Sequence, residues 1–292
     1  MTFAEAYNMY LSDPRIRGRL KPSTLRAYRK DLAAASGAIV KPVAQITTVD
    51  LSIYLDGELA PSTIARRLAA LRGLFGWSLR ERHIASDPTL ALEAPRRPRR
   101  LPRPIRADAD RLAVERAIAA APPPFRLALT ILRETCMRAG EVLALTLGDV
   151  TLAPGREALH MRDPKNRCER MVVLGPSATP KSLRSLRAHL RERKGEPDHA
   201  PLFRLNRGTR LSYDALHYQR AQACASAGLA DDNGGPCYTL HQLRHTRATE
   251  LVEQGQRLEI VQRVLGHRDP RSTQGYAELA ETQVRAALEI RR

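Results

Sequence analysis

The stretch TLHQLRHTRATEL at residues 239–251 has the signature of a helix N-terminus with cationic side chains in its first turns. Thr239 as N-cap and Gln242 three residues later form a capping box, which predicts that a helix starts here. His241 and Arg244 then lie three residues apart on one face of that helix. The free N–H groups and the dipole of a helix N-terminus attract anions. An imidazole and a guanidinium at this end therefore suit it to binding a phosphate.

This motif alone is weak, because a histidine and an arginine at this spacing also form ordinary surface pairs. His245 lies close on the same face, so spacing alone does not choose between the two histidines. TCMRAGE (135–141) adds Arg138 and Glu141, one turn apart at the start of an apolar run. A guanidinium binds two phosphate oxygens in bidentate fashion and stays charged at any working pH. Glu141 could orient such a group, or the two residues could simply form an ion pair.

Two more motifs complete the set. In DPKNRCER (163–170), Lys165 lies at the tip of an expected hairpin, where a lysine is usually solvated but can also reach into a groove. Asp269 and Pro270 are typical of the N-cap and first residue of a short helix, which places Tyr276 about two turns into it. A phenol with a pKa of about 10 is a poor nucleophile at neutral pH unless cations stabilise the phenolate. The ordinary role of any single tyrosine is packing.

The composition favours a polyanionic partner. The 292 residues include 48 Lys and Arg against 31 Asp and Glu, a formal charge of +17. Such an excess favours nucleic acid, and an aromatic content of 4% favours duplex DNA over single strands bound by base stacking. The sequence has no apolar run of about 18 residues and no signal peptide. Four widely spaced cysteines fit a reducing compartment, so we expect a cytoplasmic protein that no membrane holds.

The length predicts two domains, and the chain divides at residues 93–106, a linker rich in proline and arginine. Residues 1–92 show helical periodicity and are expected to form a helical DNA-binding domain. Residues 107–292 are expected to form a larger, mainly helical domain that contains the active site. DNA contacts are expected from arginines of the N-terminal domain and the linker: Arg66, Arg67, Arg72, Arg96, Arg97, Arg99 and Arg100. A solvated helix face and a disordered tether are the ordinary alternatives for these two segments.

Apolar periodicity also predicts individual elements. In the first domain, helix starts are expected near Thr2 or Thr24, Pro22, Thr47 and Pro61. In the second domain, we expect helices over 108–120 and 125–147, followed by strands over 158–162 and 170–174 around a turn. Further helices are expected near Ser182 and Tyr213 and after Thr239, Leu258 and Pro270.

In order and spacing, these motifs resemble the tyrosine recombinase (phage integrase) family. TCMRAGEVLAL resembles the family's first arginine motif, DPKNRCERMVVL its hairpin with a catalytic lysine, HQLRHTRATEL its HxxR box, and LGHRDPRSTQGYAEL its last box. STLRAYRKDL and STIARRLAALRGLFGWSLRERHIASDPTLAL are similar to its helical core-binding domain, so the resemblance covers nearly the whole chain. It implies a mainly α fold, in which an N-terminal helical bundle and a mixed α+β catalytic domain with a small antiparallel sheet form a C-shaped clamp.

The resemblance implies a site-specific recombinase, or integrase, that cuts and rejoins duplex DNA without ATP, metal or other cofactor. Arg138 and Arg244 would clamp the scissile phosphate, with Glu141 as the acidic companion of Arg138. Tyr276 would attack the phosphorus and form a 3′-phosphotyrosyl link. Because that link keeps the phosphodiester energy, a 5′-hydroxyl from a partner strand could reseal it.

Three further roles come from the same resemblance. Lys165 would protonate the departing 5′-oxygen, His241 would act as general acid and base near the tyrosine, and His267 would add a hydrogen bond to a phosphate oxygen. The resemblance implies four protomers on two DNA sites, from a chain that is monomeric in free solution, with the C-terminal helix 277–292 docking on a neighbour. Cys136 stands where the family usually has glycine, which predicts a different backbone turn there.

Other functions compete with this hypothesis. A topoisomerase of the phosphotyrosine type shares the chemistry but would relax supercoils without a pair of sites. A DNA-binding regulator would keep the fold and lose catalysis. A metal-dependent nuclease using Cys237, His241 and His245 has loose ligand spacing and no adjoining carboxylates. Within the family, the tail after Tyr276 lacks the pattern of the chromosome-dimer-resolving branch, which favours a recombinase of a phage, transposon or other mobile element.

Overall fold

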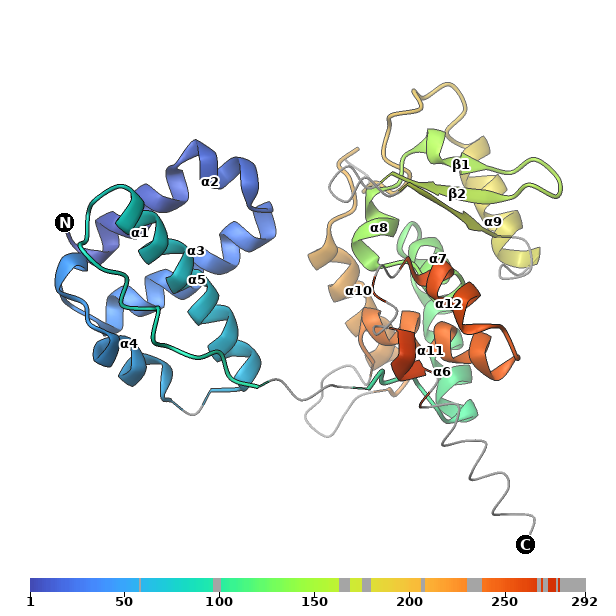
Figure 1. Ribbon diagram of the computed structural model, residues 1–292. Coiled ribbons are helices and arrows are strands. Elements are labelled where there is room, and N and C mark those ends of the chain that lie inside the picture. The colour runs from blue at the N-terminus through green and yellow to red at the C-terminus, as the bar shows by residue number, and fades with distance from the viewer. Residues whose placement is uncertain are drawn as a thin grey trace, which may run out of the picture. The chain divides into compact units, whose positions relative to one another are not determined.

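The computed structural model consists of two compact units, residues 1–99 and 100–292 (Figure 1). It describes residues 1–57, 59–96, 101–162, 169–174, 180–205, 208–229, 238–266, 269, 273–276 and 278. Both units are mainly helical, and the second contains a three-stranded antiparallel sheet. This confirms the expected fold class. Among the described residues, no helix combines the length and the apolar character needed to cross a membrane.

The first unit is a bundle of helices whose starts largely follow the sequence signals. Thr2 and Thr47 are N-caps with complete capping boxes, and two proline-initiated helices begin at Pro22 and Pro61. The elements are α1 (Phe3–Ser12), α2 (Pro14–Arg19), α3 (Pro22–Ala38), the 3₁₀ turn η1 (Val43–Gln45), α4 (Thr48–Leu55) and α5 (Pro61–Arg80).

The apolar spacing predicted for α5 forms the core of this unit. Leu68, Leu71 and Phe75 are buried, and Phe3 of α1 meets Phe75 at 6.0 Å between ring centroids. Helix α2 was not expected; Asp13 caps it through its side chain, and Pro14 provides its first residue.

The second unit gathers its helices and sheet around one large apolar core. Helix α11 packs against α7 and α12, so the HxxR box lies beside the helix that precedes Arg138. The helices are α6 (Asp108–Ala120), α7 (Phe125–Thr135), α8 (Ala139–Ala144), the 3₁₀ turn η2 (Leu147–Asp149), α9 (Pro180–Arg191), α10 (Tyr213–Ser226), α11 (Leu240–Glu253) and α12 (Leu258–Leu265).

The single helix expected over 125–147 is wrong. Helix α7 ends at Thr135, and Cys136 adopts the left-handed conformation with φ 56° and ψ 14°. A non-glycine residue in this conformation is sterically disfavoured and cannot continue a right-handed helix. Periodicity did not reveal the break, because Leu132, Val142 and Leu143 on both sides of it are buried in the same core. The break makes Arg138 the N-cap of a new helix rather than a mid-helix residue.

The sheet has the order β1 (Val150–Thr151), β2 (Ala158–Met161), β3 (Arg170–Val173), with antiparallel pairs throughout. The register of β2 and β3 pairs Ala158 with Val173 and Met161 with Arg170. The strand–turn–strand expected over 158–174 is therefore confirmed for its two strands, whereas the short β1 was not expected. Residues 163–168 between β2 and β3, which include Lys165, lie outside the described residues.

Candidate active site

Arg138 and Glu141 lie at the start of α8, directly after the break at Cys136. Glu141 accepts two hydrogen bonds from Arg138: Oε2 from the backbone N–H at 2.8 Å, and Oε1 from Nη1 at 2.8 Å. The side chain of Arg138 is 47% exposed. The helix break therefore leaves this guanidinium accessible at the N-terminus of α8, while Glu141 fixes its orientation.

Arg244 approaches the same carboxylate from α11. It is 1% exposed, and its Nη1 lies 3.9 Å from Oε2 of Glu141. Nη1 also donates to the carbonyl oxygen of Cys136 at 2.5 Å, and Nη2 donates to that of Leu265 at 2.8 Å. Burial, together with the positive charge of Arg138, lowers the pKa of Arg244 to about 10. The group is still charged at neutral pH.

A third arginine, Arg170, completes this cluster and was missed by the sequence analysis. It is the first residue of β3, and its Nη2 donates to Oε2 of Glu141 at 2.9 Å. Its Nη1 donates to the carbonyl oxygen of Val264 in α12 at 2.8 Å. Arg170 lies in the stretch ERMVVL, and nothing in the local pattern separates it from the chain's other arginines.

Tyr276 belongs to a helical turn over residues 273–276 and is 1% exposed. It packs in a small apolar cluster with Cys136, Val261 and Leu265. Its hydroxyl lies 2.5 Å from Nδ1 of His245. Burial raises the pKa of Tyr276 to about 12, against the opposing effect of the nearby arginines. The phenol is therefore protonated at neutral pH and is closed off from solvent.

The two histidines of the HxxR box occupy different positions. Thr239 and Gln242 form the expected capping box at the start of α11. His241 is an exposed residue at this end of the helix. Partial desolvation of its ring, together with the charges of Arg244 and Arg138, lowers its pKa, which favours the neutral imidazole. Its ring meets that of His245 edge-on at 4.4 Å between centroids. The phenol thus contacts His245, whose ring in turn contacts that of His241.

Other residues expected at the site lie outside the part of the chain that the structure describes. These are Lys165, His267 and the linker arginines Arg97, Arg99 and Arg100, together with the C-terminal helix expected over 277–292, of which only Glu278 is described.

The described N-terminal arginines are engaged within their own unit. Arg66 pairs with the buried carboxylate of Asp31 at 3.0 Å, and Arg67 lies over the ring of Tyr54 at 5.0 Å from its centroid. Arg72 donates to the carbonyl oxygen of Leu92. Arg96 is exposed. The first three therefore have structural roles, to which any contact with DNA would be added.

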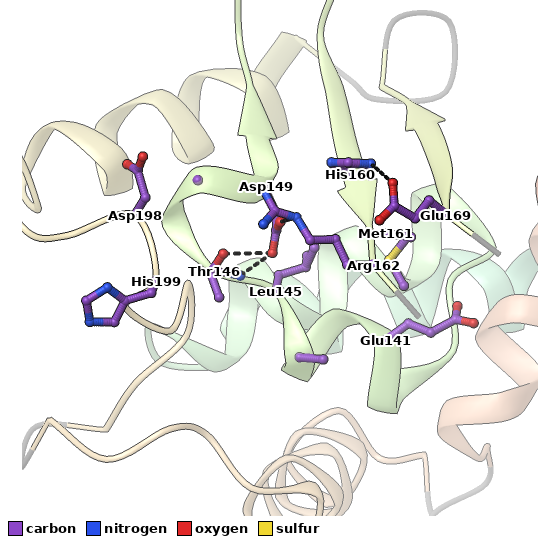
Figure 2. A pocket seen from close by; sticks show the side chains of 12 residues that line it. Glu141, Leu145, Thr146, Asp149, His160, Met161, Arg162, Glu169, Asp198 and His199 are labelled. Carbon is purple, nitrogen blue, oxygen red and sulfur yellow. Dashed lines mark hydrogen bonds and ion pairs between the residues drawn. The ribbon is translucent and has the colours of Figure 1, made fainter. Parts of the chain in front are cut away.

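A pocket of about 1240 Å³ lies between α8, η2 and strand β2 (Figure 2). Glu141 lies at one end of it and Asp198 and His199 at the other. Four carboxylates line this pocket against one arginine and two histidines: Glu141, Asp149, Glu169 and Asp198, with Arg162, His160 and His199. A phosphate would meet net negative charge here. This acidic pocket is therefore unsuited to an anion, in contrast to the arginine side of Glu141.

Comparison with known proteins identifies the family of this chain. Residues 109–283 match the phage integrase family, and residues 6–82 match the phage integrase N-terminal SAM-like domain. The chain belongs to the phage integrase family. It is a site-specific recombinase of the tyrosine type. Tyrosine recombinase XerC of Xanthomonas campestris pv. campestris is 31% identical over 283 residues, which cover 94% of this chain and 84% of the relative. Tyrosine recombinase XerD of Proteus mirabilis is 30% identical, covering 91% and 86%.

Solved structures share the fold of this family member. A lambda integrase (75–356) dimer bound to a COC′ core site superposes with a TM-score of 0.72 at 22% identity, covering 94% of this chain and 95% of the other. The Tn1549 transposon integrase in complex with a circular intermediate DNA gives a TM-score of 0.69 at 18% identity, covering 94% and 95%. At these identities the likeness concerns the fold alone.

Proposed function

We propose that this recombinase cleaves duplex DNA with Tyr276 as its nucleophile and with Arg138 and Arg244 as its phosphate clamp. The observation that carries the proposal is the meeting of Arg138 and Arg244 around one carboxylate, Glu141, close enough to Tyr276 for both charges to act on its phenol. Arg138, Arg170 and Arg244 bring three positive charges against the single charge of Glu141. The two positive charges in excess match the two negative charges of a pentacoordinate phosphorus, which carries one negative charge more than a phosphodiester.

The reaction would run in two balanced steps. Tyr276 Oη attacks the phosphorus and loses its proton to a histidine, while the bond to the 5′-oxygen breaks and Lys165 gives that oxygen a proton. The product is a 3′-phosphotyrosyl link and a free 5′-hydroxyl, and attack by the 5′-hydroxyl of a partner strand reverses the sequence. Removing one donor that stabilises such a transition state costs on the order of 10²–10³-fold in rate. His267 would add one more donor.

The family resemblance gives the proton transfer at the tyrosine to His241, whereas the contact in this structure favours His245. Nδ1 of His245 lies 2.5 Å from the phenolic oxygen. His241 lies on the exposed end of α11, within the field of Arg138 and Arg244. We propose His245 as the acceptor of the Tyr276 proton and His241 as a phosphate ligand. Under this assignment, His245→Asn lowers the cleavage rate most at a pH where the wild-type imidazole is neutral and the phenol still protonated, and His241→Asn lowers the rate by a similar factor at low and at high pH.

The movement of Tyr276 is part of this proposal. Both Tyr276 and Arg244 are 1% exposed, so the turn 273–276 must shift before a phosphate can reach either group. The motion opens the apolar cluster around Cys136, and the contact between Tyr276 and His245 has to be kept through it for His245 to take the proton.

Duplex DNA is the proposed partner, supported by the charge of +17 and by the DNA named in the lambda and Tn1549 structures. The N-terminal domain expected over residues 1–92 and the linker expected over 93–106 would bind the DNA backbone. The arginines proposed for this role are Arg66, Arg67, Arg72, Arg96, Arg97, Arg99 and Arg100. Binding would then fall steeply with salt, with log K dropping by roughly 0.9 per phosphate contact for each decade of salt. A DNA recombinase acts where its DNA lies, which in a bacterium is the cytoplasm.

We further propose a synaptic tetramer on two DNA sites and a role in a mobile element. Two duplexes must each be cut on both strands, which needs one tyrosine per cut and hence four protomers. Light scattering of the protein on a two-site duplex, against the free protein, tests this stoichiometry. The curated relatives bear the names XerC and XerD, whereas the Tn1549 integrase belongs to a transposon. Sequencing the DNA site that the protein cuts distinguishes an element end from a chromosomal site.

The test of the cleavage chemistry uses nicked duplexes drawn from the DNA around the protein's own gene. Each nick lets the cut fragment diffuse away, so that the covalent adduct accumulates, and EDTA is present throughout. Wild type and Tyr218→Phe, a control at an exposed tyrosine, should form an adduct, and Tyr276→Phe should form none. Tight binding without any adduct would instead indicate a DNA-binding regulator. Relaxation of plasmids that lack the site would indicate a topoisomerase.

A further inference from the structure

The proposed chemistry uses Arg170 only as a positive charge, yet this side chain joins three elements of the candidate active site. Its side chain is 16% exposed. From β3 it donates to Glu141 in α8 and to the carbonyl oxygen of Val264 in α12, at 2.9 and 2.8 Å. Burial lowers the pKa of Arg170, although the charge of Glu141 opposes this. A partly buried cation with two well-placed acceptors is held in one orientation.

The backbone at the end of α12 is shaped around this guanidinium. Gly266 has φ 62°, the left-handed conformation that ends the helix. A Cβ built on Gly266 would lie 2.8 Å from Cζ of Arg170, closer than van der Waals contact allows. Glycine at this position therefore provides both the turn and the room for Arg170.

Glu141 is held from two sides. Arg138 binds Oε1 through Nη1 and Oε2 through its backbone N–H, and Arg170 binds Oε2 through Nη2. Nη1 of Arg244 lies 3.9 Å from the same Oε2, beyond hydrogen-bond distance. Without Arg170, the carboxylate loses one cation, and a small rotation would bring it onto Arg244. Glu141 would then no longer hold the guanidinium of Arg138 in its observed orientation.

We propose that Arg170 is a positioning residue for strand cleavage, which acts through Glu141 to hold Arg138 in the orientation that binds the scissile phosphate. This inference rests on the proposed roles of Arg138 and Tyr276. Arg170 itself does not touch the phosphate. It also fixes the first residue of β3 to the end of α12.

The variants that test this are Arg170→Met, Arg170→Lys, Glu141→Gln and the double variant that combines Arg170→Met with Glu141→Gln. Lysine keeps the charge, but its single ammonium cannot reproduce the planar fork that serves two acceptors. The matched control is Arg187→Met in α9, which removes an arginine of the same unit that pairs with Glu157 at 3.1 Å and is 45% exposed. Rates of adduct formation are measured in single turnover at saturating nicked duplex, and the Kd for DNA is measured separately.

Arg170→Met is expected to lower the cleavage rate by about 10–100-fold, the scale of an ångström-sized misplacement, with Kd changed less than about threefold. Arg170→Lys should recover part of the rate. Because both changes act through one carboxylate, the double variant should be close to the slower single variant and not to the product of the two effects. Arg187→Met should cleave like the wild type.

Three results would overturn the proposal. These are an unchanged rate in Arg170→Met, a loss that appears in Kd alone, and multiplicative effects in the double variant. If Arg170→Met fails to fold, the same comparison is made with Arg170→Lys and its double with Glu141→Gln. The wild-type reaction separates this failure from that of the proposed function: a wild type that forms no Tyr276-dependent adduct rejects both, whereas normal wild-type cleavage with these outcomes rejects only the role of Arg170.

Discussion

Glu250→Ala should destabilise the second unit strongly, because Glu250 is the centre of a buried ion pair between α7 and α11. Its Oε1 and Oε2 accept from Nη2 and Nη1 of Arg133 at 2.5 and 2.9 Å. The two side chains are 13% and 11% exposed, and Arg247 lies 3.3 Å from the same carboxylate. Breaking a buried pair from one side costs about 3–5 kcal/mol. Glu115 remains 2.8 Å from Nε of Arg133, so we expect the lower end, about 3 kcal/mol.

For a unit of this size, about 3 kcal/mol corresponds to a fall in Tm of roughly 6–12 °C, which far-UV circular dichroism measures on heating. The control Glu259→Ala removes a carboxylate that is 75% exposed and 3.6 Å from Arg257, and should change stability by less than about 0.5 kcal/mol. A fall for Glu250→Ala no larger than that of the control would refute the assignment of this pair as the link between α7 and α11.

The same pair predicts a pH dependence. Burial alone would raise the pKa of Glu250, but the hydrogen bonds and charge of Arg133 outweigh it and hold the pKa below its ordinary value. A carboxyl whose pKa is lower in the folded than in the unfolded state stabilises the protein at neutral pH, and this stabilisation is lost as the pH falls through the folded pKa. The difference in stability between wild type and Glu250→Ala should therefore shrink in acid. If the difference in stability between wild type and Glu250→Ala stayed constant as the pH fell through the folded pKa of Glu250, the pairing with Arg133 would be contradicted.

Three further predictions concern the surroundings of the site. Cys136→Val should destabilise the protein by more than about 2 kcal/mol in urea unfolding, because a β-branched residue is strained at φ 56°, whereas Cys136→Gly should stay within about 1 kcal/mol of wild type. Thr246→Val removes the acceptor of the Ile105 N–H at 2.9 Å and should cost about 1–3 kcal/mol in the same assay. Burial raises the pKa of Tyr276 to about 12, so its phenol should ionise above the ordinary value of about 10. In an ultraviolet titration of the folded protein, Tyr276→Phe should therefore remove one tyrosine that titrates late. The stability of the wild type should fall as the pH rises from about 10 to about 12. An early-titrating Tyr276 would mean that the side chain is not buried.

Local signals in the sequence predicted much of this fold. The limits of α6 agree with the periodic segment 108–120, and the capping box of Thr239 and Gln242 starts α11 as expected. These features depend on neighbours within four residues. The break at Cys136 does not depend on neighbours in this way. Its left-handed backbone conformation is disfavoured locally, and burial of the segments on both sides maintains it.

The site was predictable as a set of motifs but not as a network of contacts. The sequence brought Arg138, Glu141, Arg244 and Tyr276 together only by resemblance, and the structure gathers the two arginines around the carboxylate of Glu141. Spacing left His241 and His245 as alternatives, because both lie on one face of α11. The contact that separates them depends on where the turn 273–276 packs, which is set by tertiary structure. For the same reason, no local signal identified Arg170.

The proposed function depends above all on a covalent link between Tyr276 and DNA, and the most direct measurement locates the bound nucleotide. The adduct trapped on nicked duplex in EDTA is digested with nuclease and trypsin and analysed by mass spectrometry. Cleavage after Arg271 and Arg285 yields peptide 272–285. Of the eight tyrosines in the chain, this peptide contains only Tyr276. We predict that the nucleotide is found on Tyr276 in this peptide. A nucleotide on any other residue, or wild-type cleavage that leaves peptide 272–285 unmodified, would contradict the proposal.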